Sequence, residues 1–154
     1  MSLTRLGAAI ALCISGAAGC ATAKSTRHPA VDIGVELWRT GDDGYTGRLG
    51  AAIETELTRT PGFTMVVEGR PGNLVVSIPR NVRCVQARQR VAILFDVSFS
   101  RREASLNERE LGSVSGQCWL DALKRCARIV TRGAADAADR IRVIQVPEAD
   151  AVRH

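Results

Sequence analysis

The sequence predicts an α+β domain, a two-layer sandwich in which two helices cover one face of a mainly antiparallel, four- to five-stranded sheet. Two observations support this prediction. Short segments with an apolar residue at every second position, the pattern of half-buried strands, follow one another through the middle of the chain. Only two segments carry apolar residues at helical spacing, one before these strands and one after them. Helices and strands separated in this way are typical of α+β domains.

The first elements are a strand and a helix. Residues 31–38 alternate apolar and polar side chains, which predicts a half-buried strand, and the Gly- and Asp-rich residues 39–47 predict a turn. Residues 48–60 predict a helix that ends before Pro61 and Gly62. Its apolar residues lie four apart and share one face: Leu49, Ile53 and Leu57.

The next four apolar segments predict consecutive strands over residues 63–68, 73–84, 90–100 and 111–119. The last three should form an antiparallel meander. Pro79 cannot donate a ladder hydrogen bond, so the second of these strands should bend or lie at an edge there.

The charged segment 101–110 predicts a hairpin loop, and 120–144 predicts a long closing helix. We expect the carboxylate of Asp121 to cap this helix, and Gly133 to cost it about 1 kcal/mol relative to Ala. One face of the strand 90–100 is polar and can meet water. Its polar residues are Asp96, Ser98 and Ser100.

The amino terminus has the layout of an export signal over residues 1–19: a positive charge at Arg5, a short apolar run, then small residues. The run is shorter than the roughly 20 residues that span a bilayer. Ala17-Ala18-Gly19-Cys20 resembles the lipobox of bacterial lipoproteins, although those prefer Leu where Ala17 stands. The resemblance implies that Cys20 is acylated, with palmitate-like chains, and anchors the protein. Ordinary cleavage after Gly19 and a cytosolic apolar terminus are the alternatives.

The rest of the chain then divides into a lipidated Cys20 with a tether over 20–30, one domain over 31–146, and a loose tail over 147–154. We expect membrane attachment through the amino-terminal lipid, on the periplasmic side of a bacterial outer membrane.

The succession of signal, lipobox, "GRLGAAIETELTRTPGF", strand meander and Ala-rich helix resembles several small envelope lipoproteins with a two-layer α+β domain. These include the lipopolysaccharide-assembly lipoprotein LptE, the amino-terminal domain of TolB, and the curli-secretion and penicillin-binding-protein-activator lipoproteins. The likeness is one of layout, over residues 31–143. It implies an accessory or assembly role and assigns no functional residue.

Composition argues against several function classes. The two histidines, His28 and His154, lie in the predicted tether and tail, so a Ser–His or Cys–His nucleophile is not expected. Asp42 and Asp43 sit in a predicted turn, where Asp bonds the local backbone. The formal net charge of +5 is mild for a nucleic-acid binder. We therefore predict a protein that is not an enzyme, with no metal, no cofactor and no nucleic-acid partner.

Three cysteines follow the anchor: Cys84, Cys118 and Cys126. An oxidising compartment permits one disulfide among them. Cys84 and Cys118 should flank the central strand at about 9–10 Å, which exceeds the usual Cα limit of about 7 Å. A bridge should therefore join Cys126 to Cys84 or to Cys118. The alternative is three small buried side chains.

Four arginines crowd one predicted loop: Arg80, Arg83, Arg88 and Arg90. Guanidinium groups recognise phosphates and carboxylates, so these residues are candidates for binding an anion or a protein partner. The alternative is a solvated sheet edge.

Together these patterns predict a non-enzymatic, membrane-anchored periplasmic lipoprotein that serves as an accessory or binding subunit in cell-envelope assembly or transport, with an envelope protein as partner. A stand-alone lipid or glycolipid binder is the alternative. A packed core with an exposed sheet edge would favour the first, and an empty cavity between helices and sheet the second.

Overall fold

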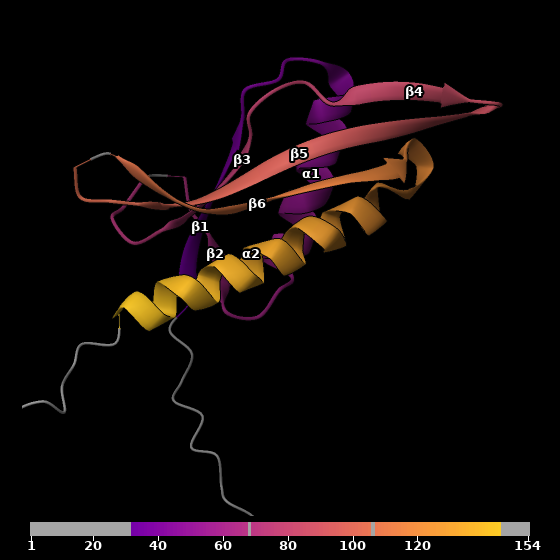
Figure 1. Cartoon of the computed structure of the whole chain (residues 1–154). Helices are drawn as coiled ribbons and strands as arrows, with labels where there is room; N and C mark the ends of the chain where they lie inside the picture. Colours follow the sequence, from indigo (N-terminus) through magenta and orange to yellow (C-terminus); the bar gives the residue numbers. More distant parts are fainter. Residues whose placement is uncertain (1–31, 68, 106, 146–154) are drawn as a thin grey trace, which may run out of the picture.

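The computed structural model describes residues 32–67, 69–105 and 107–145 and shows two helices packed on a six-stranded sheet (Figure 1). In chain order the elements are β1 (Ile33–Arg39), α1 (Gly44–Thr58), β2 (Phe63–Met65), β3 (Leu74–Ile78), β4 (Arg83–Ala87), β5 (Arg90–Arg102), β6 (Glu108–Trp119), a 3₁₀ turn (Leu120–Ala122) and α2 (Leu123–Gln145). The strand order is β2-β1-β3-β5-β4, with β6 on the other edge of β5. The long β5 therefore pairs with β3 and β4 along one edge and with β6 along the other.

The α+β class is confirmed, but a sheet of four or five strands is wrong, because the sheet has six strands, and its antiparallel pairs are joined by two parallel ones. The sheet is mixed, because β1 runs parallel to both β2 and β3. The physical reason lies in the connection: α1 carries the chain back along the sheet before β2 begins, and a helical crossover allows parallel pairing. The predicted meander is confirmed, since β5 is antiparallel to β3, β4 and β6.

The predicted strand 73–84 is two strands, because the chain leaves the sheet at Pro79 and returns at Arg83. Pro79 lacks the donor that would continue the ladder. The connection is held by α1, since the Val82 N–H donates to the Thr46 hydroxyl over 2.9 Å.

The prediction of a charged loop over 101–110 is also wrong. The strands β5 and β6 continue into it and leave 103–107 between them, because the charges pair across the ladder. Arg102 lies opposite Glu108, and Ser100 donates to the Glu108 carboxylate over 2.6 Å.

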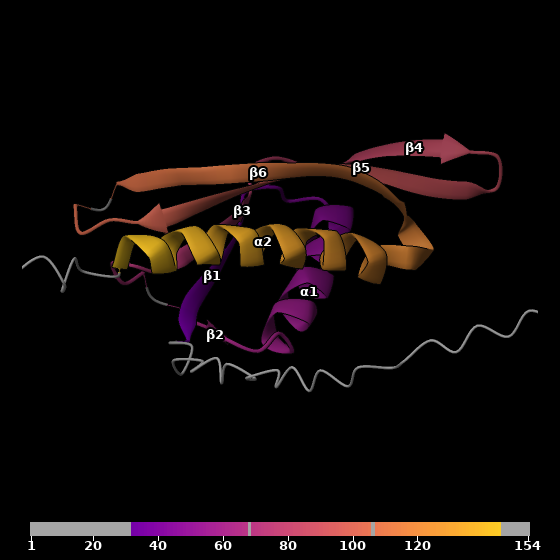
Figure 2. The same ribbon diagram turned by 60° about the horizontal axis from the view of Figure 1, so that its bottom comes forward.

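The core lies between the helices and one face of the sheet. Apolar side chains from both layers are fully buried there, including Leu49, Ile53 and Leu57 of α1, Val76 of β3, Ile93 of β5, and Val130 and Ile141 of α2. Both helices thus cover the same face, as the sequence predicts. In Figures 1 and 2, α2 runs beneath β6 and α1 lies beside it.

The helix starts differ from expectation. Asp121 does not cap α2: it lies in the 3₁₀ turn before that helix and accepts two hydrogen bonds from Arg90. Asp43 instead caps α1, because its carboxylate accepts from the N–H groups of Tyr45 and Thr46, each over 2.8 Å. These bonds satisfy donors that the first helical turn leaves unpaired.

Gly133 allows α2 to approach the sheet closely. A Cβ at this position would lie 2.8 Å from the ring of Phe99, which is only 3% exposed. Glycine at position 133 is therefore needed for the packing of α2 against the sheet. The sequence indicates only its cost in helix propensity.

We expect Gly133→Ala to destabilise the protein by about 1 kcal/mol, because overpacking of about 1–3 kcal/mol exceeds the gain in helix propensity. Gly47→Ala in α1 is the matched control, since a Cβ there meets nothing within 4 Å and should stabilise by about 0.5–1 kcal/mol. Urea unfolding measures both. A gain in stability from Gly133→Ala would contradict the close contact.

Candidate partner-binding surface

The hairpin formed by β4 and the start of β5 projects beyond the helices. We call residues 83–94 the hairpin arm. In Figures 1 and 2 its tip extends past the first turn of α2. The first four residues of β4 are exposed, among them Val85, whose relative exposure is 47%. The arm therefore offers an accessible strand that no helix covers.

The outer edge of β4 carries unpaired backbone groups. Among the described strands β4 pairs with β5 alone. The two-residue turn Arg88–Gln89 makes Ala87 and Arg90 a hydrogen-bonded pair, and such pairs alternate along an antiparallel ladder. The N–H and C=O groups of Cys84 and Gln86 therefore point away from β5. They can accept an additional strand.

The four candidate arginines do not form one cluster. Arg80 lies before the arm and donates to Asp96 over 2.9 Å. Asp96 also accepts from Ser115 over 2.6 Å, and these two bonds, the Ser115 bond first, hold the pKa of its carboxyl below the ordinary value. Arg80 is thus tied to the polar face of the sheet.

Arg90, the residue directly after the turn at the tip of the arm, is engaged within the domain. Its guanidinium donates to both carboxylate oxygens of Asp121, over 2.7 and 2.9 Å, and lies 4.4 Å from the ring centroid of Trp119. These contacts fasten the arm to the turn before α2.

Arg83 and Arg88 are the two candidates that remain available to a partner. Both are exposed, and neither pairs with a carboxylate within the part of the chain that the structure describes. Arg88 occupies the tip of the arm, with φ of 57°. The free edge of β4 is therefore flanked by two positive charges that form no close ion pair in the described structure, although Arg83 acts on Asp96 at longer range.

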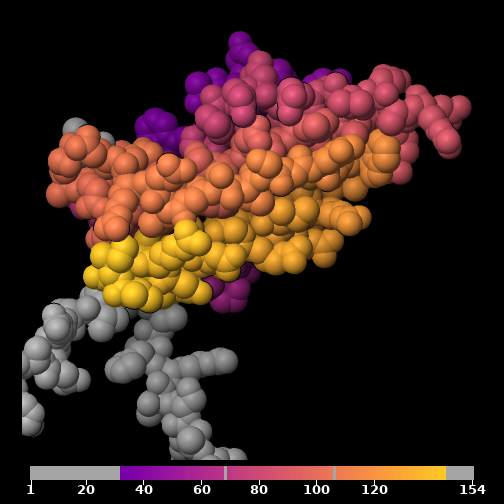
Figure 3. All heavy atoms as spheres, in the orientation of Figure 1, coloured from indigo at the N-terminus to yellow at the C-terminus, as the bar shows by residue number. Residues whose placement is uncertain are grey.

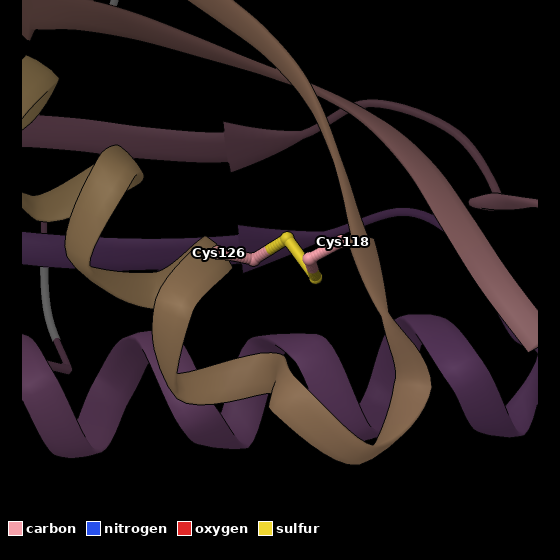
Figure 4. Close-up of a disulfide and its surroundings, with 2 residues drawn as sticks. All are labelled: Cys118 and Cys126. Carbon is pink, nitrogen blue, oxygen red and sulfur yellow. A yellow bond between two sulfur atoms is a disulfide. The ribbon is translucent and has the colours of Figure 1, made fainter.

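A disulfide joins Cys118 at the end of β6 to Cys126 in α2, with 5.9 Å between the Cα atoms (Figure 4). The sequence left two possible partners for Cys126, Cys84 and Cys118, and the structure pairs it with Cys118. Cys84 is opposite Ile93, which is opposite Cys118, so the central strand separates them as expected. Cys84 is an exposed free thiol on β4. The bridge fastens α2 to the sheet.

A buried ion pair that no sequence pattern predicted lies on the sheet face away from the helices. The side chain of Glu36 is bonded to Arg102 over 2.8 and 3.1 Å, and it also accepts from Asn73 over 3.0 Å and from Trp38 over 3.1 Å. Glu36 is 2% exposed and Arg102 8% exposed. Gly69 lies directly against the guanidinium, where a Cβ would come within 2.6 Å. The only sequence signal was a Glu within an apolar strand.

Burial would raise the pKa of Glu36, but the hydrogen bonds from Arg102, Asn73 and Trp38 outweigh it and hold this pKa below the ordinary value. The bond to Glu36 likewise raises the pKa of Arg102. This network holds β1, the start of β3 and the end of β5 together, and its groups are mutually satisfied. Its role is structural.

The lowered pKa of Glu36 predicts a specific acid sensitivity. A carboxyl with a lowered folded-state pKa stabilises the protein above its unfolded-state pKa, and that stability is lost as pH falls through the folded value. We therefore expect stability to fall below about pH 4.5, and to fall less steeply in Glu36→Gln. Thermal melts from pH 6 to pH 3 check this. Equal slopes for the two proteins would contradict it.

Comparisons with known proteins add little. No family model and no curated protein matches the chain. Among solved structures, the chain is similar to a minor lipoprotein from Acinetobacter baumannii, with 15% identity over 75% of this chain and 90% of that one, and a TM-score of 0.35. So low a score does not establish a common fold.

Several predicted features fall outside the described residues: the signal 1–19, the anchor Cys20, the tether to residue 30 and the tail 147–154. None of the described helices is long and apolar enough to cross a membrane. Across the described ranges, no group of three or more His, Cys, Asp or Glu side chains is placed to hold a metal ion.

Proposed function

We propose that this protein is a non-enzymatic lipoprotein, anchored through acylated Cys20 on the periplasmic side of the outer membrane, which binds an envelope protein through its hairpin arm. It would serve as an accessory subunit in envelope assembly or transport. The observation that carries the proposal is the free outer edge of β4 on an arm that no helix covers.

The mode of binding follows from the geometry of that edge. An extended partner segment can add to β4 by hydrogen-bonding the outward groups of Cys84 and Gln86, since exposed strand edges accept added strands. Exposed Val85 supplies an apolar contact, and Arg83 and Arg88 favour a segment that carries acidic side chains. The expected partner is therefore a protein with an acidic extended segment.

The packing disfavours the stand-alone lipid or glycolipid binder. Such a protein needs an apolar cavity, and pockets for small molecules are commonly about 300–1,000 Å³. Side chains that face each other between the helices and the sheet, including Leu49, Val76, Val130 and Ile141, are fully buried. The space where an acyl chain would lie is filled.

The arm is tested by photo-crosslinking in cells. A photoreactive amino acid at Gln86 should capture a defined envelope protein, whereas the same group at exposed Gln117 on β6 should not. Mass spectrometry identifies the captured protein. Capture from both positions, or from neither, would contradict the assignment of the arm.

Proline at Cys84 separates strand addition from other binding modes. Cys84→Pro removes an N–H that points away from β5, so the β4–β5 ladder should survive while the added strand loses a donor. We expect crosslinking at Gln86 to fall at least tenfold, with Cys84→Ser as the matched control that retains it. Unchanged capture by a folded Cys84→Pro protein would exclude strand addition.

The anchor is tested independently. We expect Cys20→Ala to release the protein from the membrane fraction, and mass spectrometry of the wild type to show an acylated amino-terminal Cys20. An unmodified Cys20 in membrane-bound protein would contradict the lipoprotein assignment.

A further inference from the structure

The outer surface of α2 is rich in positive charge that the fold leaves uncompensated. Arg125, Arg128 and Arg132 are exposed and lie three and four residues apart, so they share one side of the helix. No carboxylate pairs with any of the three within the described ranges. Lys124 nearby has only a contact of 3.8 Å to Glu56.

These arginines line a groove between α1 and α2. The groove has a volume of about 660 Å³ and is also bordered by Thr60, Thr131 and the carboxylate of Glu56, which lies 3.8 Å from Lys124. The Thr131 hydroxyl is buried and has no hydrogen-bond partner among the residues that the structure describes. Guanidinium and hydroxyl groups together suit phosphate oxygens.

The same helix ends in exposed apolar residues. Val143 is 75% exposed and Ile144 is 43% exposed. Val143 follows Arg125 by five turns of about 3.6 residues, so both point to the same side of α2. Two acidic residues, Asp136 and Asp139, lie on this same side between Arg132 and Val143; Asp139 is bonded to Arg142 over 2.7 Å, so the positive charge of this side is concentrated in its first half. Arginines with exposed aliphatic side chains are typical of helices that lie on membrane surfaces.

The chain enters the domain beside this end of α2. The Ile33 N–H donates to the Gly62 carbonyl over 2.9 Å, and Gly62 lies directly against the Arg142 guanidinium. Twelve residues separate Cys20 from Ile33, which limits the span between them to about 45 Å. Such a tether keeps this end of the domain at a high effective concentration near the bilayer.

We infer that the outer surface of α2 is a membrane-docking face: Arg125, Arg128 and Arg132 contact anionic phospholipid headgroups, and Val143 inserts among them. The lipid surface is the one in which the Cys20 acyl chains sit, so the inference rests on the proposed anchor. In Figure 3 the atoms of α2 form a continuous strip along the lower edge of the molecule. Since β4 lies across β5 from β6, docking of α2 would leave the arm free for its partner.

The test uses the acylated protein in vesicles, in a Cys84→Ser background so that one introduced cysteine carries a fluorophore. The label is placed at Val143→Cys, with Gln86→Cys on the arm as the comparison site. Vesicles of phosphatidylcholine, with or without phosphatidylglycerol, contain a headgroup-nitroxide lipid that quenches at short range. We expect quenching at position 143 to be at least about threefold stronger with phosphatidylglycerol, and weak at position 86 in both.

Two charge variants decide whether the arginines are responsible. Arg125→Gln, Arg128→Gln and Arg132→Gln together should reduce quenching at position 143 to the phosphatidylcholine level. Arg80→Gln, Arg83→Gln and Arg88→Gln remove the same charge from the region of the arm and should leave quenching at position 143 unchanged. Salt at 0.5 M should weaken the wild-type signal, because it screens such contacts.

Three results would overturn the inference: equal quenching in both kinds of vesicle, equal loss with both triple variants, or release by inorganic phosphate at constant ionic strength. The last would indicate a discrete phosphate site rather than a membrane face. Failure of the anchor is recognised separately, because unacylated protein would not float with vesicles of phosphatidylcholine alone.

Discussion

Arg102→Met is expected to cost about 3–5 kcal/mol of unfolding free energy, the largest effect of any single substitution considered for this protein. The change leaves Glu36 buried at 2% exposure without its bidentate partner. The bonds from Asn73 and Trp38 remain, but neutral donors cannot replace a guanidinium. Urea denaturation at pH 7 measures the loss.

The matched control for Arg102→Met is Arg80→Met. Arg80 also pairs with a carboxylate, at 2.9 Å, but its side chain is 74% exposed. An ion pair so open to solvent contributes about 0–1 kcal/mol. Similar losses for the two variants would mean that burial of the Glu36–Arg102 pair does not decide its contribution.

Replacing both Cys118 and Cys126 by Ala is expected to cost about 2.5 kcal/mol, the second-largest effect. The two bridged cysteines are eight residues apart in the sequence. Loss of the bridge raises the conformational entropy of the unfolded chain and so destabilises the folded protein. It also releases the start of α2 from the end of β6, where both cysteines are buried. Thermal unfolding with and without reductant gives the same comparison in the wild type.

Cys84→Ser is the control for the disulfide, because Cys84 is exposed and unpaired. We expect its stability to match the wild type and its reductant sensitivity to be unchanged. Reductant that failed to lower the stability of the wild type would contradict a Cys118–Cys126 bridge in solution.

The proposed docking of α2 on the membrane and the proposed binding of a partner by the arm use different surfaces of the domain. The arm presents β4 with Arg83 and Arg88, while α2 presents Arg125, Arg128 and Arg132. Substitutions in one set should therefore leave the readout of the other unchanged. An anchored subunit oriented by α2 would hold the arm toward the periplasm.

Local patterns predicted most of the elements. Alternation predicted β5 and β6, and the four-residue spacing of Leu49, Ile53 and Leu57 predicted the buried face of α1. Pro79 predicted a bend in one strand over 73–84, which the structure divides into β3 and β4. These features depend on residues close together in the chain, whose periodicity states which face is buried. The order of strands in the predicted meander also placed the central strand between Cys84 and Cys118, as the structure has it.

The sequence by itself therefore determined the α+β class and the core faces, because both follow from periodicity along single segments. Only the tertiary structure decided the parallel pairing of β1, the burial of Glu36 with Arg102, and the contact of Gly133 with Phe99. These join residues far apart in the chain, whose partners are chosen by the packing of the whole domain. The same packing tied Arg90 to Asp121 and left Arg83 and Arg88 free of carboxylate partners in the described structure.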